Sequence, residues 1–136
     1  MRAFEGLQSP GTSMSKHGLM IHSGLSGPFR LTYDGIEGAV KRRSPGVYAL
    51  GYAAPDGKFF VNSIGRCDMD LRARLREHIG SAMLFNYDYF LSPRAAFERE
   101  CELFHDLRPP GNRIHPDRPK GTTLDCPRCR IFGQRS

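Results

Sequence analysis

A turn sequence between two apolar runs is the feature that most constrains the fold. Pro55-Asp56-Gly57 separates Gly46–Ala53 from Lys58–Ile64, and both runs are rich in apolar and aromatic residues. Such runs on either side of a turn-forming tripeptide are typical of a β-hairpin. We therefore expect two antiparallel strands here, and the rest of the fold must pack around them.

Two helices should follow the hairpin. The first begins at Asp68 or Asp70 and carries an apolar stripe at helical spacing, formed by Leu71, Leu75 and Ile79. The second begins at Ser92, an N-cap residue followed by proline at the first helical position, and runs to about Leu107. The remaining segments predict an entry strand or cover at Gly27–Leu31, a short helix at Tyr33–Val40, a loop at Ser81–Asn86 and a third strand at Tyr87–Leu91.

These elements predict an α/β (α+β) domain with a small central antiparallel three-stranded sheet flanked by helices. Residues 1–25 are rich in Gly and Ser, lack periodicity and are expected to form a flexible leader. Residues 26–112 should form the folded domain, including the N-terminal cover segment. Residues 113–136 are expected to be a basic tail rich in Pro and Arg that contains Cys126-Pro127-Arg128-Cys129.

The charge of the chain suggests a polyanionic partner. A net charge of +6 and a pI near 9.5 suit nucleic acid, although many small basic domains bind none. The chain shows neither an apolar run long enough to span a bilayer nor an apolar region of a secretory signal near Met1, so we expect no membrane partner and a cytoplasmic protein.

The second predicted helix places a carboxylate among apolar residues. Glu100 falls in the middle of the arc formed by Ala96, Phe97, Cys101, Leu103, Phe104 and Leu107. A charged carboxylate on a core-facing stripe is costly without a cation or metal partner. Glu100 is therefore either half of a structural ion pair, a side chain that reaches solvent at a groove, or part of a functional site.

Several of these segments resemble one nuclease superfamily in order and spacing. Gly46-Val47-Tyr48, Ile64-Gly65, the segment DLRARLREH at 70–78, Glu100 and Pro109-x-x-Asn112 are similar to the motifs of GIY-YIG nucleases and cover about half of the chain. The resemblance implies a metal-dependent endonuclease that hydrolyses DNA phosphodiester bonds with one divalent ion. It further implies a small α/β domain with a central antiparallel sheet flanked by helices.

The same resemblance implies a role for each matching residue. Tyr48 would help activate the attacking water, Arg74 would neutralise the scissile phosphate, and His78 would be a proton-transfer partner. Glu100 would be the sole protein ligand of Mg²⁺ or Mn²⁺, and Asn112 would support the site. A hard cation that keeps several waters needs few protein ligands. A phenol acts as a base near neutral pH only if its pKa is lowered, which we expect of the nearby arginine and the metal.

The second motif departs from the family pattern, because Ser63 stands before Ile64-Gly65 where the family has a tyrosine. The alternative is therefore a non-catalytic module of the same fold that binds nucleic acid or protein. An active site would bring Tyr48, Arg74 and Glu100 together on an open concave surface, whereas the module would have a blocked groove or Glu100 in an ion pair with arginine. Ser63 and Gly65 are expected to support the site.

Partner and metal contacts complete the expectations. DNA would contact basic residues such as Arg66, Arg72 and Arg76, and a homodimer or partner protein would supply specificity, because no separate recognition domain is evident.

Cys126-Pro127-Arg128-Cys129 is half of a zinc site, for which His115, His105, Cys101 or a second chain would complete the ligands. Unliganded thiols and a redox pair are the alternatives. Zinc would attach the tail beside the helix of Glu100.

Overall fold

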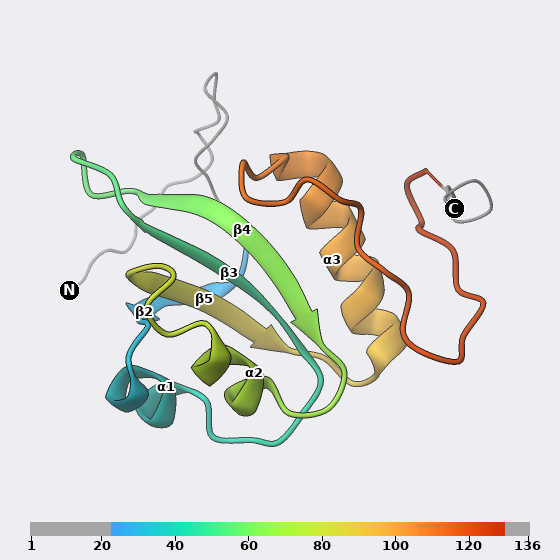
Figure 1. Ribbon diagram of the computed structural model, residues 1–136, viewed down its shortest axis with the longest axis horizontal. Coiled ribbons are helices and arrows are strands. Elements are labelled where there is room, and N and C mark those ends of the chain that lie inside the picture. The colour runs from blue at the N-terminus through green and yellow to red at the C-terminus, as the bar shows by residue number, and fades with distance from the viewer. Residues whose placement is uncertain (1–22, 130–136) are drawn as a thin grey trace.

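The computed structural model describes residues 23–129 of the chain (Figure 1). Its elements, in chain order, are β2 (Ser26–Arg30), α1 (Tyr33–Ala39), β3 (Gly46–Ala53), β4 (Phe59–Cys67), α2 (Leu71–Glu77), β5 (Leu84–Tyr89) and α3 (Pro93–Leu107). The strands form an antiparallel sheet in the order β2-β5-β3-β4. The α+β class is confirmed, and β4 lies at an edge of the sheet.

The predicted hairpin is confirmed as β3 and β4. Their pairing runs from Gly46↔Cys67 to Ala53↔Phe59. The turn is closed by the amide of Ala54, which donates to the carbonyl of Lys58 at 2.7 Å. Strand β4 extends three residues beyond the predicted end at Ile64.

The sheet has four strands, so the predicted three-stranded sheet is wrong. The segment expected as an entry strand or cover pairs with β5 in the register Phe29↔Phe85 and becomes its outer neighbour. Strand β5 begins at Leu84 and ends at Tyr89, whereas the prediction placed Ser81–Asn86 in a loop. The bounds of β5 are determined by its pairing with β2 on one side and β3 on the other. The alternation of residues within the segment did not indicate this pairing.

The helices begin where the sequence predicts. The side chains of Thr32, Asp70 and Ser92 cap α1, α2 and α3 by accepting hydrogen bonds from backbone amides three residues later. Helix α2 ends at Glu77, so the prediction that Ile79 continues the apolar stripe of this helix is wrong: the residue is 43% exposed. Among residues 23–129, no helix is long and apolar enough to cross a membrane.

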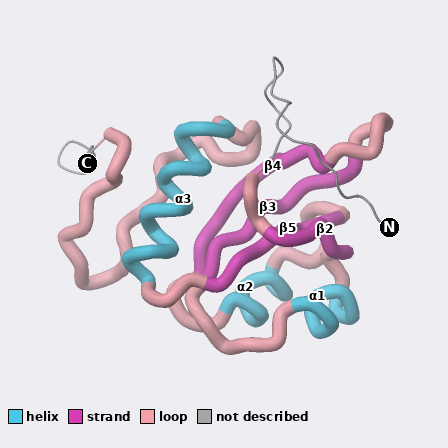
Figure 2. Tube along the Cα trace, turned by 180° about the vertical axis from the view of Figure 1, so that it is seen from behind, coloured by secondary structure: helices cyan, strands magenta, loops and turns pink. Residues whose placement is uncertain are grey.

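Alternation along β3 divides the core between the two faces of the sheet. Tyr48 and Leu50 pack with α1 and α2, whereas Val47 and Ala49 pack on the side of α3. Figures 1 and 2 show the two shorter helices together on one side of the sheet and α3 on the other. This division determines which functional side chains lie on each face.

The described part of the C-terminal tail packs along α3 (Figure 1). Cys126 is fully buried against Phe97 and Cys101 of that helix. At the other end of the chain, Arg99 donates a hydrogen bond to the carbonyl of Ser23 at 2.9 Å. The rest of the predicted leader, residues 1–22, and residues 130–136 of the tail lie outside the described residues.

Candidate functional site

Three of the predicted catalytic residues meet on the α2 face of the sheet. The hydroxyl of Tyr48, in the first half of β3, lies 2.9 Å from Nε2 of His78 at the C-cap of α2. Arg74 precedes His78 by about one helical turn and interacts with the same hydroxyl. Tyr48 is only 5% exposed, whereas the side chain of Arg74 is 42% exposed. We call Tyr48, Arg74 and His78 the tyrosine cluster.

Burial determines the protonation of this cluster. It raises the pKa of Tyr48 to about 12, against the opposing effect of the Arg74 guanidinium. Arg74 lowers this pKa, as expected, but burial raises it by more, so the pKa of Tyr48 lies above its ordinary value of 10. Burial, followed by the charge of Arg74, lowers the pKa of His78. At neutral pH the phenol is protonated and the imidazole neutral, so the hydroxyl can donate to Nε2.

Gly65 makes room for the tyrosine. It pairs directly with Tyr48 across the hairpin, and a Cβ at this position would overlap the phenol ring and its hydroxyl. Ser63 precedes Gly65 by two residues on β4 and therefore faces the same side of the sheet. The predicted supporting residues thus lie beside the tyrosine cluster.

Asn112 supports the outer edge of β4. Its Oδ1 accepts from the amide of Ile64 at 2.7 Å, and its Nδ2 donates to the carbonyl of the same residue at 3.0 Å. The side chain thereby takes the place of a neighbouring strand. Arg74 Nη1 donates to the carbonyl of Arg66 on this strand at 3.2 Å, so the tyrosine cluster is also attached to β4.

Glu100 lies on the α3 face and is paired with Arg66. Nη1 of Arg66 lies 2.8 Å from Oε1 of Glu100, and the two side chains are 11% and 10% exposed. Arg66 also donates to Asp68 at 2.6 Å and to the Asp117 carbonyl at 2.7 Å. Burial raises the pKa of Glu100 to about 7, although the charge of Arg66 opposes it. An ion pair between Glu100 and an arginine is the arrangement expected of a non-catalytic module.

The predicted nucleic-acid contacts are engaged within the fold. Arg66 is held by the groups around Glu100, so it must leave them to reach a ligand. Arg72 lies 3.0 Å from a carboxylate oxygen of Glu37 in α1, and Arg76 pairs with the other oxygen. Local sequence patterns do not indicate the partners Glu100 and Glu37, because these lie 34 to 39 residues away in the chain.

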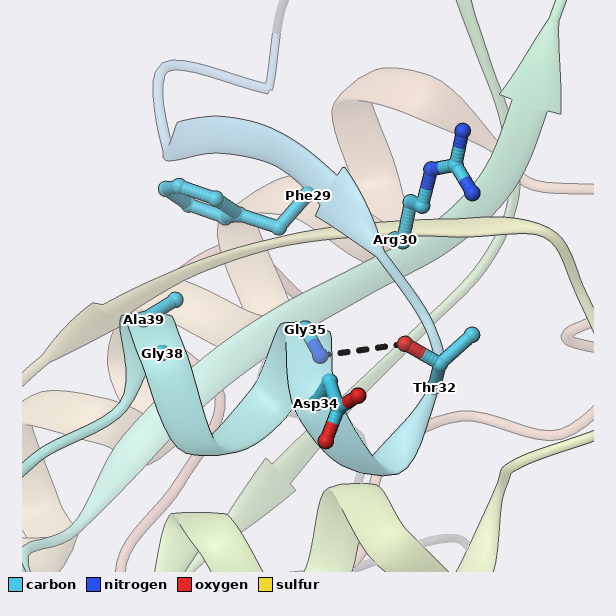
Figure 3. A pocket seen from close by; sticks show the side chains of 7 residues that line it. All are labelled: Phe29, Arg30, Thr32, Asp34, Gly35, Gly38 and Ala39. Atoms are coloured by element: carbon cyan, nitrogen blue, oxygen red, sulfur yellow. Dashed lines mark hydrogen bonds between the residues drawn. The ribbon is translucent and has the colours of Figure 1, made fainter.

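A hollow of about 610 Å³ lies on another part of the surface, beside α1 (Figure 3). Its lining residues are Phe29, Arg30, Thr32, Asp34, Gly35, Gly38 and Ala39. The Thr32 hydroxyl that lines it is already used to cap α1. This hollow contains neither the tyrosine cluster nor Glu100, so we do not assign it to their site.

Two cysteines and two histidines form a group that could hold a metal ion. His105 of α3, His115, Cys126 and Cys129 place their ligand atoms within 4.8 Å of one another. We call these four residues the His/Cys cluster. Each sulfur lies 3.5 Å from the Nε2 of a histidine. A tetrahedral site with Zn–S near 2.3 Å and Zn–N near 2.05 Å requires a sulfur–nitrogen separation of about 3.5 Å.

The surroundings of the His/Cys cluster also suit a metal. Nδ1 of His115 lies 2.8 Å from the Pro116 carbonyl, a contact that directs Nε2 towards Cys129. Burial opposes ionisation of Cys126, but the backbone amides of Cys129 and Arg128 donate to its sulfur, and its pKa is lowered to about 6. Burial raises the pKa of Cys101, which stays a thiol. Of the candidates that could complete the CPRC pair, the two histidines therefore fit, and Cys101 lies outside the group.

The chain was compared with protein-family models, curated proteins and solved structures, and none of them matches.

Proposed function

We propose that the protein is a metal-dependent endonuclease that hydrolyses DNA phosphodiester bonds by a GIY-YIG-type mechanism. The observation that carries the proposal is the 2.9 Å contact between the Tyr48 hydroxyl and a neutral His78, with Arg74 beside it. Buried titratable groups in hydrogen-bond contact are typical of catalytic sites. The sequence resemblance supplies the reaction class.

The residues of the tyrosine cluster divide the chemistry. The Tyr48 hydroxyl orients the attacking water and passes a proton to Nε2 of His78, so a high phenol pKa is no obstacle. The partly exposed guanidinium of Arg74 binds the scissile phosphate and offsets its developing negative charge. Gly65 and Asn112 keep β4 in the position that these contacts require.

The donor atoms near Glu100 fit a hard divalent cation. A carboxylate and a backbone carbonyl, that of Asp117, already surround the Arg66 cation, and oxygen is the donor that Mg²⁺ and Mn²⁺ prefer. Glu100 lies on the other face of the sheet, but its charge acts on Tyr48. When bound to Glu100, the ion would stabilise charge on the phosphate oxygens and the leaving group. Arg66 would then share or release Oε1 while it keeps its contacts with Asp68 and Asp117.

The test is cleavage of labelled duplex, branched and single-stranded DNA with Mg²⁺ or Mn²⁺. Glu100→Ala and Arg74→Ala should abolish cleavage and leave the fold intact. Arg94→Ala is the matched control, because Arg94 pairs with Glu98 on the solvated side of α3. Normal cleavage by Glu100→Ala would show that the site is assigned wrongly.

The second candidate function is a non-catalytic module that binds nucleic acid or protein. The buried Arg66–Glu100 pair favours it, as does Ser63 in place of the family's tyrosine. This function predicts that the chain binds nucleic acid or a protein partner and cleaves no DNA under any metal condition. Breaking this pair with Arg66→Gln would then produce no cleavage. The binding partner would have to be identified in a separate binding assay.

We further propose that the ion in the His/Cys cluster is structural Zn²⁺. The cysteines of residues 23–129 are free rather than disulfide-bonded, as the reducing cytoplasm that we propose as the protein's location requires. Elemental analysis of protein purified without chelators should find about one zinc per chain. Protein without zinc would contradict this assignment. Specificity for a DNA structure would come from a second copy of the chain or a partner protein.

A further inference from the structure

The His/Cys cluster and Glu100 are joined by a short path through the fold. His115, a member of the cluster, is two residues from Asp117, whose carbonyl accepts a hydrogen bond from Arg66 at 2.7 Å. The same nitrogen of Arg66 contacts Glu100 at 2.8 Å. The side chain of Arg66 therefore links the Glu100 carboxylate directly to the backbone segment that carries His115.

We propose that a metal ion in the His/Cys cluster positions Arg66 on Glu100 by fixing the segment that contains Asp117. The inference rests on the proposed function, which places a metal ion in the His/Cys cluster and gives Glu100 a role in cleavage. The contact between Arg66 and the Asp117 carbonyl is present in the structure whether or not the protein cleaves DNA.

The position of the segment depends on the cluster for a physical reason. Asp117 lies in a stretch without helix or strand, between His115 and Cys126. His105 belongs to α3, whereas the other three members of the cluster belong to the tail. An ion shared by both would cross-link the tail to the helix and restrict the loop between them, much as a disulfide restricts a chain.

Arg66 is therefore a positioning residue rather than a catalytic one. It is held at two other places, by Asp68 and by the Asp117 carbonyl, so it can orient Glu100 without depending on it. Loss of the carbonyl would leave one Nη1 proton without its partner, so the Nη1 group would be restrained less firmly while Asp68 still holds Nε and Nη2. Outer contacts of this kind typically change metal affinity or activity by roughly 10- to 100-fold when they are lost.

The test follows the Arg66 guanidinium by ¹⁵N NMR in the full chain, loaded with zinc, stripped by a chelator and reloaded with Cd²⁺. We expect separate, slowly exchanging Nη signals for Arg66 in the loaded protein, averaged signals after stripping, and recovery with Cd²⁺. Arg72 is the internal control, because it pairs with Glu37 on the opposite face of the sheet. Its signals should not change, and the amide spectrum of β2 and α1 should show that the fold persists.

Cys129→Ser gives a second route to the metal-free state if chelation disturbs the fold. Arg66 signals that are the same with and without metal would overturn the inference, as would a cluster that binds neither zinc nor Cd²⁺. A chain that cleaves no DNA but shows the Arg66 response would contradict the nuclease proposal alone. A chain that cleaves through Glu100 without that response would contradict this inference alone.

Discussion

The hydroxyl of Tyr48 lies 2.9 Å from Nε2 of His78, although the two residues are 30 positions apart in the sequence. The contact joins the centre of the sheet to the end of α2. The pKa of the buried Tyr48 phenol is raised to about 12, and its hydrogen-bond acceptor, the His78 imidazole, is neutral at pH 7.

We expect Tyr48→Phe to reduce DNA cleavage by roughly 100-fold or more, because proton transfer by a positioned group contributes on that scale. The ring and its packing remain, so the fold should persist. Tyr87→Phe is the matched control: it also removes a hydroxyl on this face of the sheet, one that donates to the Ala39 carbonyl at 2.8 Å. Equal cleavage rates for the two variants would exclude Tyr48 from the reaction.

Glu100 should make the folded state less stable as the pH rises. Its folded pKa of about 7 lies above the ordinary value of 4.5, so between these values the folded state holds a proton that the unfolded state has lost. Stability from this group is therefore greatest below pH 4.5 and falls up to pH 7, by about 3 kcal/mol in total at about 1.4 kcal/mol per unit.

The measurement is urea unfolding of wild type and Glu100→Gln between pH 5 and 7.5 without added divalent cation. The difference between the two free energies of unfolding should change with pH, and wild type should lose stability relative to the variant as pH rises. Glu98→Gln, on the solvated side of α3, should parallel wild type. A constant difference between wild type and Glu100→Gln would contradict the raised pKa.

Gly65→Ala should destabilise the protein by roughly 1–3 kcal/mol, because the added methyl group overlaps the Tyr48 ring in a packed core. Cleavage should fall as well, since the ring must move away from His78. Gly38→Ala in α1 is the control, because a Cβ there has open space and alanine favours a helix by roughly 0.5–1 kcal/mol. Thermal unfolding of both variants measures the contrast.

Cys129→Ala should remove the zinc, whereas Cys101→Ala should retain it. Cys129 belongs to the His/Cys cluster, and Cys101 lies outside it although it packs against Cys126. Zinc content per folded chain is the measurement, with circular dichroism to confirm folding. Zinc retained by Cys129→Ala and lost by Cys101→Ala would show that the ligand set is wrong.

The sequence by itself determined the features that depend on neighbouring residues. The hairpin around Pro55-Asp56-Gly57, the start of α3 at Ser92 and the place of Glu100 on the core-facing stripe of α3 all follow from turn chemistry, capping and helical periodicity. These signals act within a few residues of the chain, so they can be read before the fold is known.

Only the tertiary structure decided which distant groups meet. It made Ser26–Arg30 a fourth strand, gave Glu100 the buried partner Arg66, and brought His105 and His115 to the CPRC pair. Each of these contacts joins segments that are far apart in the chain, and its formation depends on how the intervening elements pack. Local propensity contains no record of that packing, because the same arginine or histidine would be equally stable in solvent.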